Sequence, residues 1–186
     1  MAPPSFAELF IKLHGSKVVA KEDYCPFNRF INYENEANEF VKVRENDYLI
    51  LKETLFSNKT YLESQEKVLC HNDSQRSNII KDLNNNYYLI DFEFVANNDP
   101  IYDIAAFGNG KVSEGLEVLK ETYPSLDNDK LSRYYLWRIF VSLQWYNVAL
   151  IKHIRGEGKA HKINFYQVSE HFIKNAKEAF RLLNNL

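Results

Sequence analysis

The sequence predicts an α+β fold that is mainly helical, in a single domain over residues 1–186. Most of the chain carries apolar residues at the spacing of amphipathic helices. In the middle, Ile79–Ile80 and Tyr87–Ile90 read as two short strands joined by the Asn-rich turn 82–86. A composition of 45% apolar and 26% charged residues suits one globular core. We therefore expect a helical domain with a small β-hairpin inserted in it.

Three helices are expected before the hairpin. The first covers Ser5–His14, with Ser5 as a candidate N-cap and Gly15 as a stop. The second covers Asn32–Phe40, and Asn28 or Asn32 would cap it. The third is a long helix over 47–62, because its apolar residues recur near the helical period.

Four helices are expected after the hairpin. A short one includes Asp103–Phe107, and another covers about 113–121. The segment 131–151 is apolar on more than one face, which predicts a central, buried helix. After an interruption near Arg155, the segment 164–183 has apolar residues at helical spacing and closes the domain.

Composition disfavours several classes of function. The formal net charge of −2 lacks the basic excess of nucleic-acid-binding proteins, so nucleic acid is an unexpected partner. No window approaches eighteen apolar residues, and Met1–Pro4 lacks the start of a signal peptide, so we expect a cytoplasmic protein without a membrane span. Cys25 and Cys70 make neither a disulfide framework nor a zinc motif.

The residues with the clearest chemistry lie immediately before and after the predicted hairpin. His71, Asp73 and Asn78 form H-x-D-x-x-x-x-N, and Asp91 follows the second strand. This order is typical of phosphoryl transfer, in which one Asp accepts the substrate hydroxyl proton while an Asn and a second Asp hold Mg²⁺. We predict Asp73 as the catalytic base and Asn78 and Asp91 as metal ligands. We interpret His71 as a structural brace of the loop.

At this point the chain resembles the choline kinase and aminoglycoside phosphotransferase family. The stretch His71–Asn78 is similar to the family's catalytic loop, and Asp91–Phe94 is similar to the D-F-E-[YF] signature of the choline and ethanolamine kinase branch. The resemblance implies the C-terminal lobe of a protein-kinase-like fold, ATP as co-substrate, Mg²⁺ as cofactor, and Glu93 as a further metal ligand. It covers essentially the whole chain, but only as that lobe.

The nucleotide-binding N-terminal lobe is expected to be absent from these 186 residues. Lys17–Lys21 invites comparison with the strand lysine of protein kinases. However, Gly15 is the only glycine before Gly108, so no glycine-rich loop precedes this stretch. We interpret Lys17–Lys21 as a solvated connector. The missing lobe, or a second copy of the chain in a homodimer, is a candidate partner.

Aromatic residues suggest the substrate. A quaternary ammonium group binds to aromatic faces. By resemblance, Trp145 and Tyr166 fall where choline kinases place pocket aromatics, with Trp137, Tyr102 and Tyr146 as further candidates. We therefore expect transfer of the ATP γ-phosphate to the hydroxyl of choline or a similar amino alcohol. Two alternatives stay open: an aminoglycoside or other small-molecule phosphotransferase, and a non-catalytic module that binds a substrate or a protein.

Overall fold

A computed structural model of the protein describes residues 5–42 and 44–186, without the side chain of His161. The expectation that Met1–Pro4 does not begin a signal peptide lies outside these residues. The described chain is mainly helical, and its elements are α1 (Phe6–His14), α2 (Pro26–Phe40), α3 (Asn46–Ser57), α4 (Lys59–Glu63), β1 (Val68–Cys70), the 3-10 turn η1 (Arg76–Asn78), β2 (Ile79–Lys81), β3 (Tyr87–Leu89), β4 (Ala96–Asn98), α5 (Pro100–Phe107), α6 (Val112–Thr122), α7 (Asn128–Ile154), α8 (Gly158–His161) and α9 (Phe165–Leu183).

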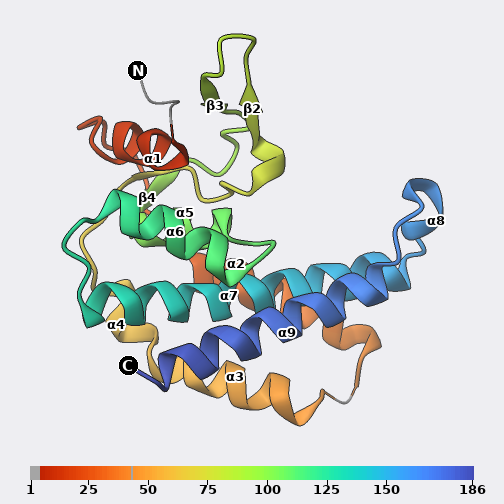
Figure 1. The fold of residues 1–186 in the computed structure, drawn as a ribbon. Coiled ribbons are helices and arrows are strands. Elements are labelled where there is room, and N and C mark those ends of the chain that lie inside the picture. The colour runs from red at the N-terminus through yellow and green to blue at the C-terminus, as the bar shows by residue number, and fades with distance from the viewer. Residues whose placement is uncertain (1–4, 43) are drawn as a thin grey trace.

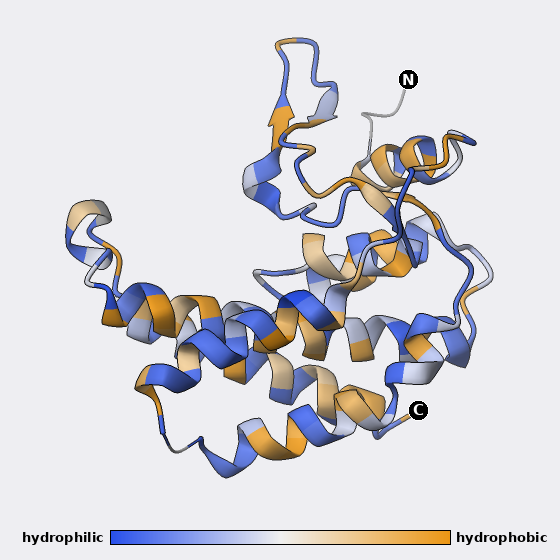
Figure 2. Ribbon diagram, turned by 180° about the vertical axis from the view of Figure 1, so that it is seen from behind, coloured by the Kyte–Doolittle hydropathy of each residue, from blue (hydrophilic) through white to orange (hydrophobic). Residues whose placement is uncertain are grey.

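Helix α7 runs through the middle of the molecule (Figure 1). Helix α9 lies alongside it, α3 packs against both, and α5 packs on another side of α7. The β2–β3 hairpin and α1 lie together at one end, away from the α3 and α9 layer (Figure 1). Seen from behind, the helices alternate hydrophobic and hydrophilic residues, as amphipathic helices require (Figure 2).

The central position predicted for the segment 131–151 is confirmed, because α7 is in contact with helices on several sides. The ring of Phe140 packs edge-on against Phe27 of α2, with centroids 5.3 Å apart. On another face, Arg138 donates a hydrogen bond to the backbone oxygen of Ala105 in α5 at 2.6 Å. A helix surrounded in this way has to be apolar on more than one face.

Two helix expectations need correction. Helix α2 begins at Pro26, with Cys25 and not Asn28 or Asn32 at its N-cap. Proline fits the first turn of a helix, where its missing N–H has no intrahelical partner. The single helix expected over 47–62 is two helices, α3 and α4, which break at Asn58. The Asn58 side chain donates to the backbone oxygen of Thr54 at 2.8 Å, which competes with continued helical bonding.

The predicted hairpin is confirmed. Strands β2 and β3 pair antiparallel, with Ile79 opposite Leu89. Their turn is held by Asp82, whose carboxylate accepts the backbone N–H groups of Asn84 and Asn86 at 2.8 Å each. Asn85 has a φ of +67°, in the left-handed region that Asn tolerates. Strand pairing therefore brings the end of the catalytic loop next to the start of the loop that follows β3.

A second strand pair was not predicted. Strand β1 pairs antiparallel with β4, and Cys70 lies opposite Ala96. This pair places the residues that precede the catalytic loop beside those that follow the 91–95 loop. Of the helices that the structure describes, none is both long and apolar enough to cross a bilayer.

Candidate active site

The loop between β1 and β2 carries the predicted catalytic residues. Its backbone turns at Asn72, which has a φ of +64°. The Asn72 side-chain amide donates to the backbone oxygens of Phe94 at 2.9 Å and Ala96 at 3.2 Å, and its Oδ1 accepts from Asn98 at 2.9 Å. Asn72 thus ties the catalytic loop to the residues that follow Asp91.

Asp103 of α5 anchors the same loop from the core. Its buried carboxylate accepts the backbone N–H of His71 and that of Asn72, each at 2.8 Å. The Ser74 hydroxyl donates to the backbone oxygen of Asp103 at 2.6 Å. Hydrogen bonds to an ionised acceptor are stronger than neutral ones. Asp73 therefore extends from a backbone that is fixed on both sides.

His71 is fully buried, and both of its ring nitrogens have partners. Its Nε2 lies 2.8 Å from the backbone oxygen of Ile90. A carbonyl only accepts, so Nε2 carries the proton and Nδ1 is available to accept the backbone N–H of Asp73 at 3.3 Å. These contacts join the two loops, which supports the interpretation of His71 as a brace and not a proton carrier.

The side chains of Asp73 and Asn78 are directly hydrogen-bonded. Nδ2 of Asn78 donates to the backbone oxygen of Asp73 at 2.8 Å and to its carboxylate at 3.0 Å. The amide nitrogen is thereby occupied, which leaves Oδ1 of Asn78 as the atom available to a cation. Burial raises the pKa of the Asp73 carboxyl, although the charge of Arg29 and the hydrogen bond from Asn78 oppose that shift.

Asp91 is held close to Asn78 by the hairpin. The backbone N–H of Ile90 donates to the backbone oxygen of Asn78 at 2.9 Å. Asp91 itself has a φ of +65°, and the carboxylates of Asp91 and Glu93 are exposed. Carboxylate and amide oxygens are the hard ligands that Mg²⁺ prefers. The donor atoms of Asn78, Asp91 and Glu93 are therefore of the kind that fits this ion, and their role as its ligands stays a prediction.

A cation that the sequence did not single out lies beside these loops. Arg29 of α2 donates to the Tyr24 hydroxyl at 2.9 Å, and its guanidinium lies 3.8 Å from the centre of the Phe94 ring. The same charge opposes the rise in the pKa of Asp73. Arg29 therefore connects helix α2 with both the catalytic loop and the loop that carries Asp91.

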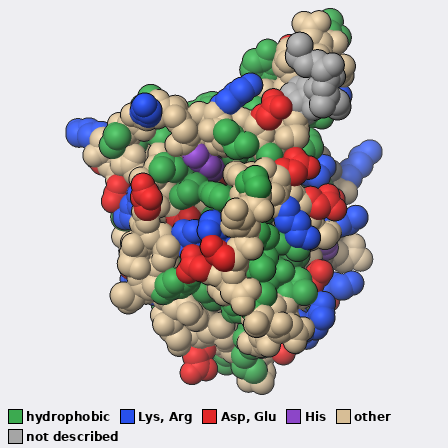
Figure 3. Space-filling model, turned by 60° about the vertical axis from the view of Figure 1, so that its left-hand side comes forward, with side chains coloured by type: hydrophobic (Ala, Val, Ile, Leu, Met, Phe, Trp, Pro, Cys, Tyr) green, Lys and Arg blue, Asp and Glu red, His purple; other side chains and the backbone are tan. Residues whose placement is uncertain are grey.

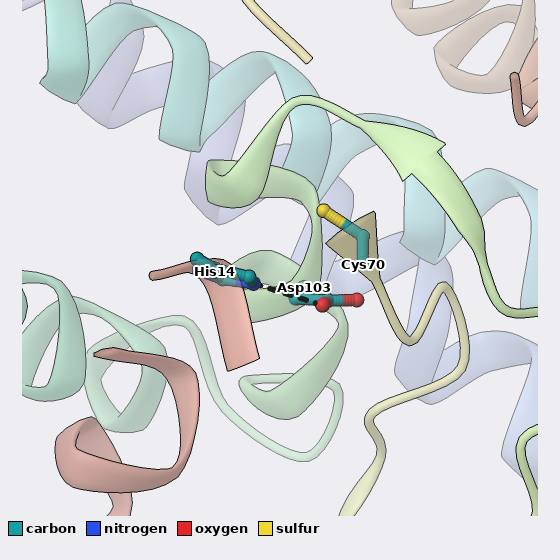
Figure 4. Close-up of side chains that lie close together, drawn as sticks. All are labelled: His14, Cys70 and Asp103. Atoms are coloured by element: carbon teal, nitrogen blue, oxygen red, sulfur yellow. Dashed lines mark hydrogen bonds and ion pairs between the residues drawn. The ribbon is translucent and has the colours of Figure 1, made fainter. Parts of the chain in front are cut away.

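His14, Cys70 and Asp103 place three potential metal-ligand atoms within 4.8 Å of one another (Figure 4). In the structure, however, His14 Nε2 lies 3.0 Å from the Asp103 carboxylate, and the Cys70 thiol donates to the backbone oxygen of Asn98 at 3.3 Å. Burial raises the pKa of the Cys70 thiol, and the charge of Asp103 adds to the rise. A metal needs the thiolate, so we interpret this cluster as a brace between α1 and the catalytic loop.

Three of the rings predicted to bind substrate are core residues. Trp137 and Tyr102 are almost fully buried, with ring centroids 5.1 Å apart, and Trp137 Nε1 donates to Asp99 at 2.8 Å. Tyr146 is also buried, and its ring lies 5.3 Å from that of Tyr48. Packing of α7 into the core uses these rings, so the expectation that they line a substrate pocket is not supported.

Trp145 and Tyr166 are more accessible than these core rings, and Trp145 packs against the edge of the core. Trp145 is half-buried and stacks on Phe172 of α9 at 6.3 Å. Tyr166 is 48% exposed, 5.6 Å from the ring of His153. At 1.5 Å per residue, His153 is about 24 Å along α7 from Trp137. The substrate-binding roles of Trp145 and Tyr166 stay predictions.

Large apolar side chains are exposed on α1 and the connector after it (Ile11, Val18 and Val19) and on the β2–β3 hairpin and the loop after it (Ile80, Ile90, Phe92 and Val95). Figure 3 shows hydrophobic side chains among the charged ones on one side of the molecule. Lys17–Lys21 has neither helix nor strand, and Val19 is 80% exposed, which confirms a solvated connector.

A comparison with protein families identifies the family to which the chain belongs. The model of the choline/ethanolamine kinase family matches residues 7–136, well over half of the sequence. The chain belongs to the choline/ethanolamine kinase family. The matched region includes Asp73, Asn78 and Asp91, and it ends before Trp145 and Tyr166. No curated protein matches the chain.

Solved structures show the fold of this family member. A choline/ethanolamine kinase family protein from Mesorhizobium loti matches with a TM-score of 0.75 and 18% identity, over 93% of this chain and 59% of that one. Choline kinase LicA from Streptococcus pneumoniae matches with a TM-score of 0.69 and 20% identity, over 97% and 62%. A structure of LicA in complex with AMP gives 0.71 and 20%, over 97% and 61%.

These likenesses confirm the predicted fold class, the mainly helical C-terminal lobe of a kinase-like fold. The family member described here spans about 60% of the length of those solved chains. Sequence reasoning missed Asn72, Asp103 and Arg29. The sequence signal for Asp103 was its place in the helix expected around Asp103–Phe107, which does not reveal that its carboxylate faces the catalytic loop.

Proposed function

We propose that this chain is the catalytic and substrate-binding lobe of a small-molecule kinase, which transfers the γ-phosphate of ATP to the hydroxyl of choline or a similar small amino alcohol. The observation that carries the proposal is the direct contact between Asp73 and Asn78, beside a hairpin that ends at Asp91. Family membership supports the kinase chemistry. The LicA structure with AMP supports an adenine nucleotide as the donor.

In this proposal Asp73 accepts the hydroxyl proton of the substrate as the oxygen attacks the γ-phosphate. Its carboxylate is oriented by the Asn78 amide, and its backbone is anchored through the neighbouring residues His71 and Asn72 to Asp103. Positioning of this kind is a major part of catalysis, because phosphoryl transfer needs little covalent help from the protein.

Asn78 Oδ1 and the Asp91 carboxylate would hold Mg²⁺, with Glu93 as a further ligand. The ion neutralises charge on the phosphate oxygens when it is bound. The chain's own contribution is to keep both ligands at one end of the hairpin, which the bond from Ile90 to Asn78 does. His71 joins the same two loops from the buried side.

We expect the 186-residue chain alone to transfer phosphate very poorly. The sequence contains no glycine-rich loop before the catalytic motif, so backbone donors for the β- and γ-phosphates are not supplied by these residues. Choline-dependent release of ADP by the purified chain measures this. Robust turnover would contradict the expectation that a separate nucleotide-binding lobe is needed to complete the site.

We expect choline to bind better than ethanolamine if Trp145 and Tyr166 contact the substrate. A methylated ammonium gains about 0.5–2 kcal/mol from each aromatic face. Trp145→Ala would then lose choline affinity, and Trp145→Phe would retain part of it. Isothermal titration of choline, ethanolamine and kanamycin against the wild type and both variants measures these affinities.

The same titration tests the alternatives. Unchanged choline binding in Trp145→Ala would show that Trp145 does not contact the substrate and serves only in packing on Phe172. Tighter binding of kanamycin than of choline would favour an aminoglycoside phosphotransferase. Trp137 and Tyr102 are buried, whereas Trp145 and Tyr166 are more accessible and contact other rings. Another small-molecule alcohol is therefore a second candidate substrate.

A further inference from the structure

The turn between α7 and α9 projects from the helical bundle. Helix α8 lies at its tip, beyond the ends of the long helices (Figure 1). Residues 152–162 contain four Lys or Arg residues and one acidic residue, Glu157. Arg155 forms an ion pair with Glu36 of α2 at 2.5 Å. Lys152, Lys159 and Lys162 therefore carry the positive charge of this projection, in a chain whose formal net charge is −2.

Large apolar side chains are exposed on the same projection. Ile154, Ile163 and Tyr166 are 39%, 44% and 48% exposed. Figure 2 shows hydrophobic and hydrophilic residues mixed along this segment. Lysine side chains with interspersed Ile and Tyr are the combination found on segments that lie in a membrane interface.

A hollow of about 430 Å³ lies between these residues. It is lined by Lys159 and Lys162, by His153, and by the apolar side chains of Ile163 and Phe165. Gly156, with a φ of +73°, lets the chain turn tightly at its edge. The hollow thus combines cationic side chains with an apolar lining, which suits a phosphate headgroup attached to an acyl chain.

We propose that the α7–α9 projection, residues 152–165, is a docking surface for an anionic phospholipid membrane. The lysines face the negatively charged headgroups, and the exposed side chains of Ile154 and Ile163 enter the interface. A projecting tip reaches a flat surface without requiring the rest of the molecule to touch it. The bound chemistry is a phosphate group, and the proposal commits to phosphate presented by a lipid bilayer. It is independent of the proposed catalysis.

Vesicle co-sedimentation of the 186-residue chain tests the proposal. Vesicles of phosphatidylcholine with 30 mol% phosphatidylglycerol are expected to bind the chain, while pure phosphatidylcholine vesicles do not. Each Lys near an anionic surface contributes about 1 kcal/mol, so Lys159→Gln/Lys162→Gln is expected to lower the partition coefficient about 30-fold. Ile163→Ser is expected to lower it several-fold, about the effect of one exposed apolar side chain.

A matched control is Lys12→Gln/Lys120→Gln, which removes the same charge from exposed sites in α1 and α6. It is expected to bind as the wild type does. Equal loss in control and tip variants, or equal binding to both vesicle types, would overturn the proposal.

Displacement by millimolar glycerol 3-phosphate would assign the hollow to a free phosphate ester. Binding of duplex DNA as tight as that of the anionic vesicles, unaffected by Ile163→Ser, would assign it to nucleic acid.

Discussion

Asp73→Asn is expected to lower kcat by about 10²–10⁴-fold, because it removes the proposed general base. The measurement needs a protein that joins this chain to a nucleotide-binding lobe. Nucleotide affinity is expected to change little, since the amide keeps the volume of the carboxyl and Asn78 can still donate to its oxygen. Steady-state kinetics with choline, together with a nucleotide titration, separates the two effects.

The matched control is Asp47→Asn, which removes a carboxylate from an exposed ion pair with Lys177, away from the loops. It is expected to leave kcat unchanged. A kcat for Asp73→Asn within tenfold of the wild type would contradict the assignment of the base. An equal loss of nucleotide affinity in Asp73→Asn and Asp91→Asn would contradict the separate roles proposed for these residues.

Asp103→Ala is expected to destabilise the fold by about 3–5 kcal/mol, because it leaves two buried backbone N–H groups without an acceptor. These are the N–H groups of His71 and Asn72, each 2.8 Å from the carboxylate in the structure. The contact with His14 is lost as well. Urea unfolding of the wild type and the variant gives the difference in the free energy of unfolding.

Asp103→Asn distinguishes the loss of hydrogen bonds to the catalytic loop from the loss of side-chain packing, because it keeps the size of the side chain. The amide retains one oxygen acceptor, so the loss is expected to lie between zero and that of Asp103→Ala. The exposed ion pair of Asp47 and Lys177 provides the comparison, since Asp47→Ala is expected to cost less than about 1 kcal/mol. If Asp103→Ala cost no more than Asp47→Ala, Asp103 would not be the anchor of the catalytic loop.

The hairpin and the order of the site residues were readable from the sequence because both depend on local chemistry. The Asn-rich turn forms through Asp82, a neighbour in sequence, and strand pairing then sets Asn78 near Asp91. Helical periodicity likewise gave α7 and its central place. The division of 47–62 at Asn58 escaped prediction, since a single side-chain bond decides it.

The missed features depend on contacts between distant segments. Strand β4 contains Asn97 and Asn98, a residue type that is uncommon in strands. It forms because Asn97 Oδ1 accepts the backbone N–H of Ala20 at 2.8 Å and because β1 pairs with it. Arg29 was missed for the same reason, since its partner Phe94 is far away in sequence. Helical spacing likewise does not reveal which face of α7 meets the core, so the burial of Trp137 and Tyr146 was not predicted.

If Asn78 and Asp91 hold a divalent cation beside Asp73, paramagnetic Mn²⁺ in place of Mg²⁺ will bind there. In a nitrogen-15 NMR titration of the 186-residue chain, we expect the Asn78 side-chain amide and the backbone amides of 91–93 to broaden first. Asp91→Asn should abolish this broadening, and the exposed control Asp47→Asn should preserve it. Strongest broadening elsewhere, or an unchanged pattern in Asp91→Asn, would rule out this cation site.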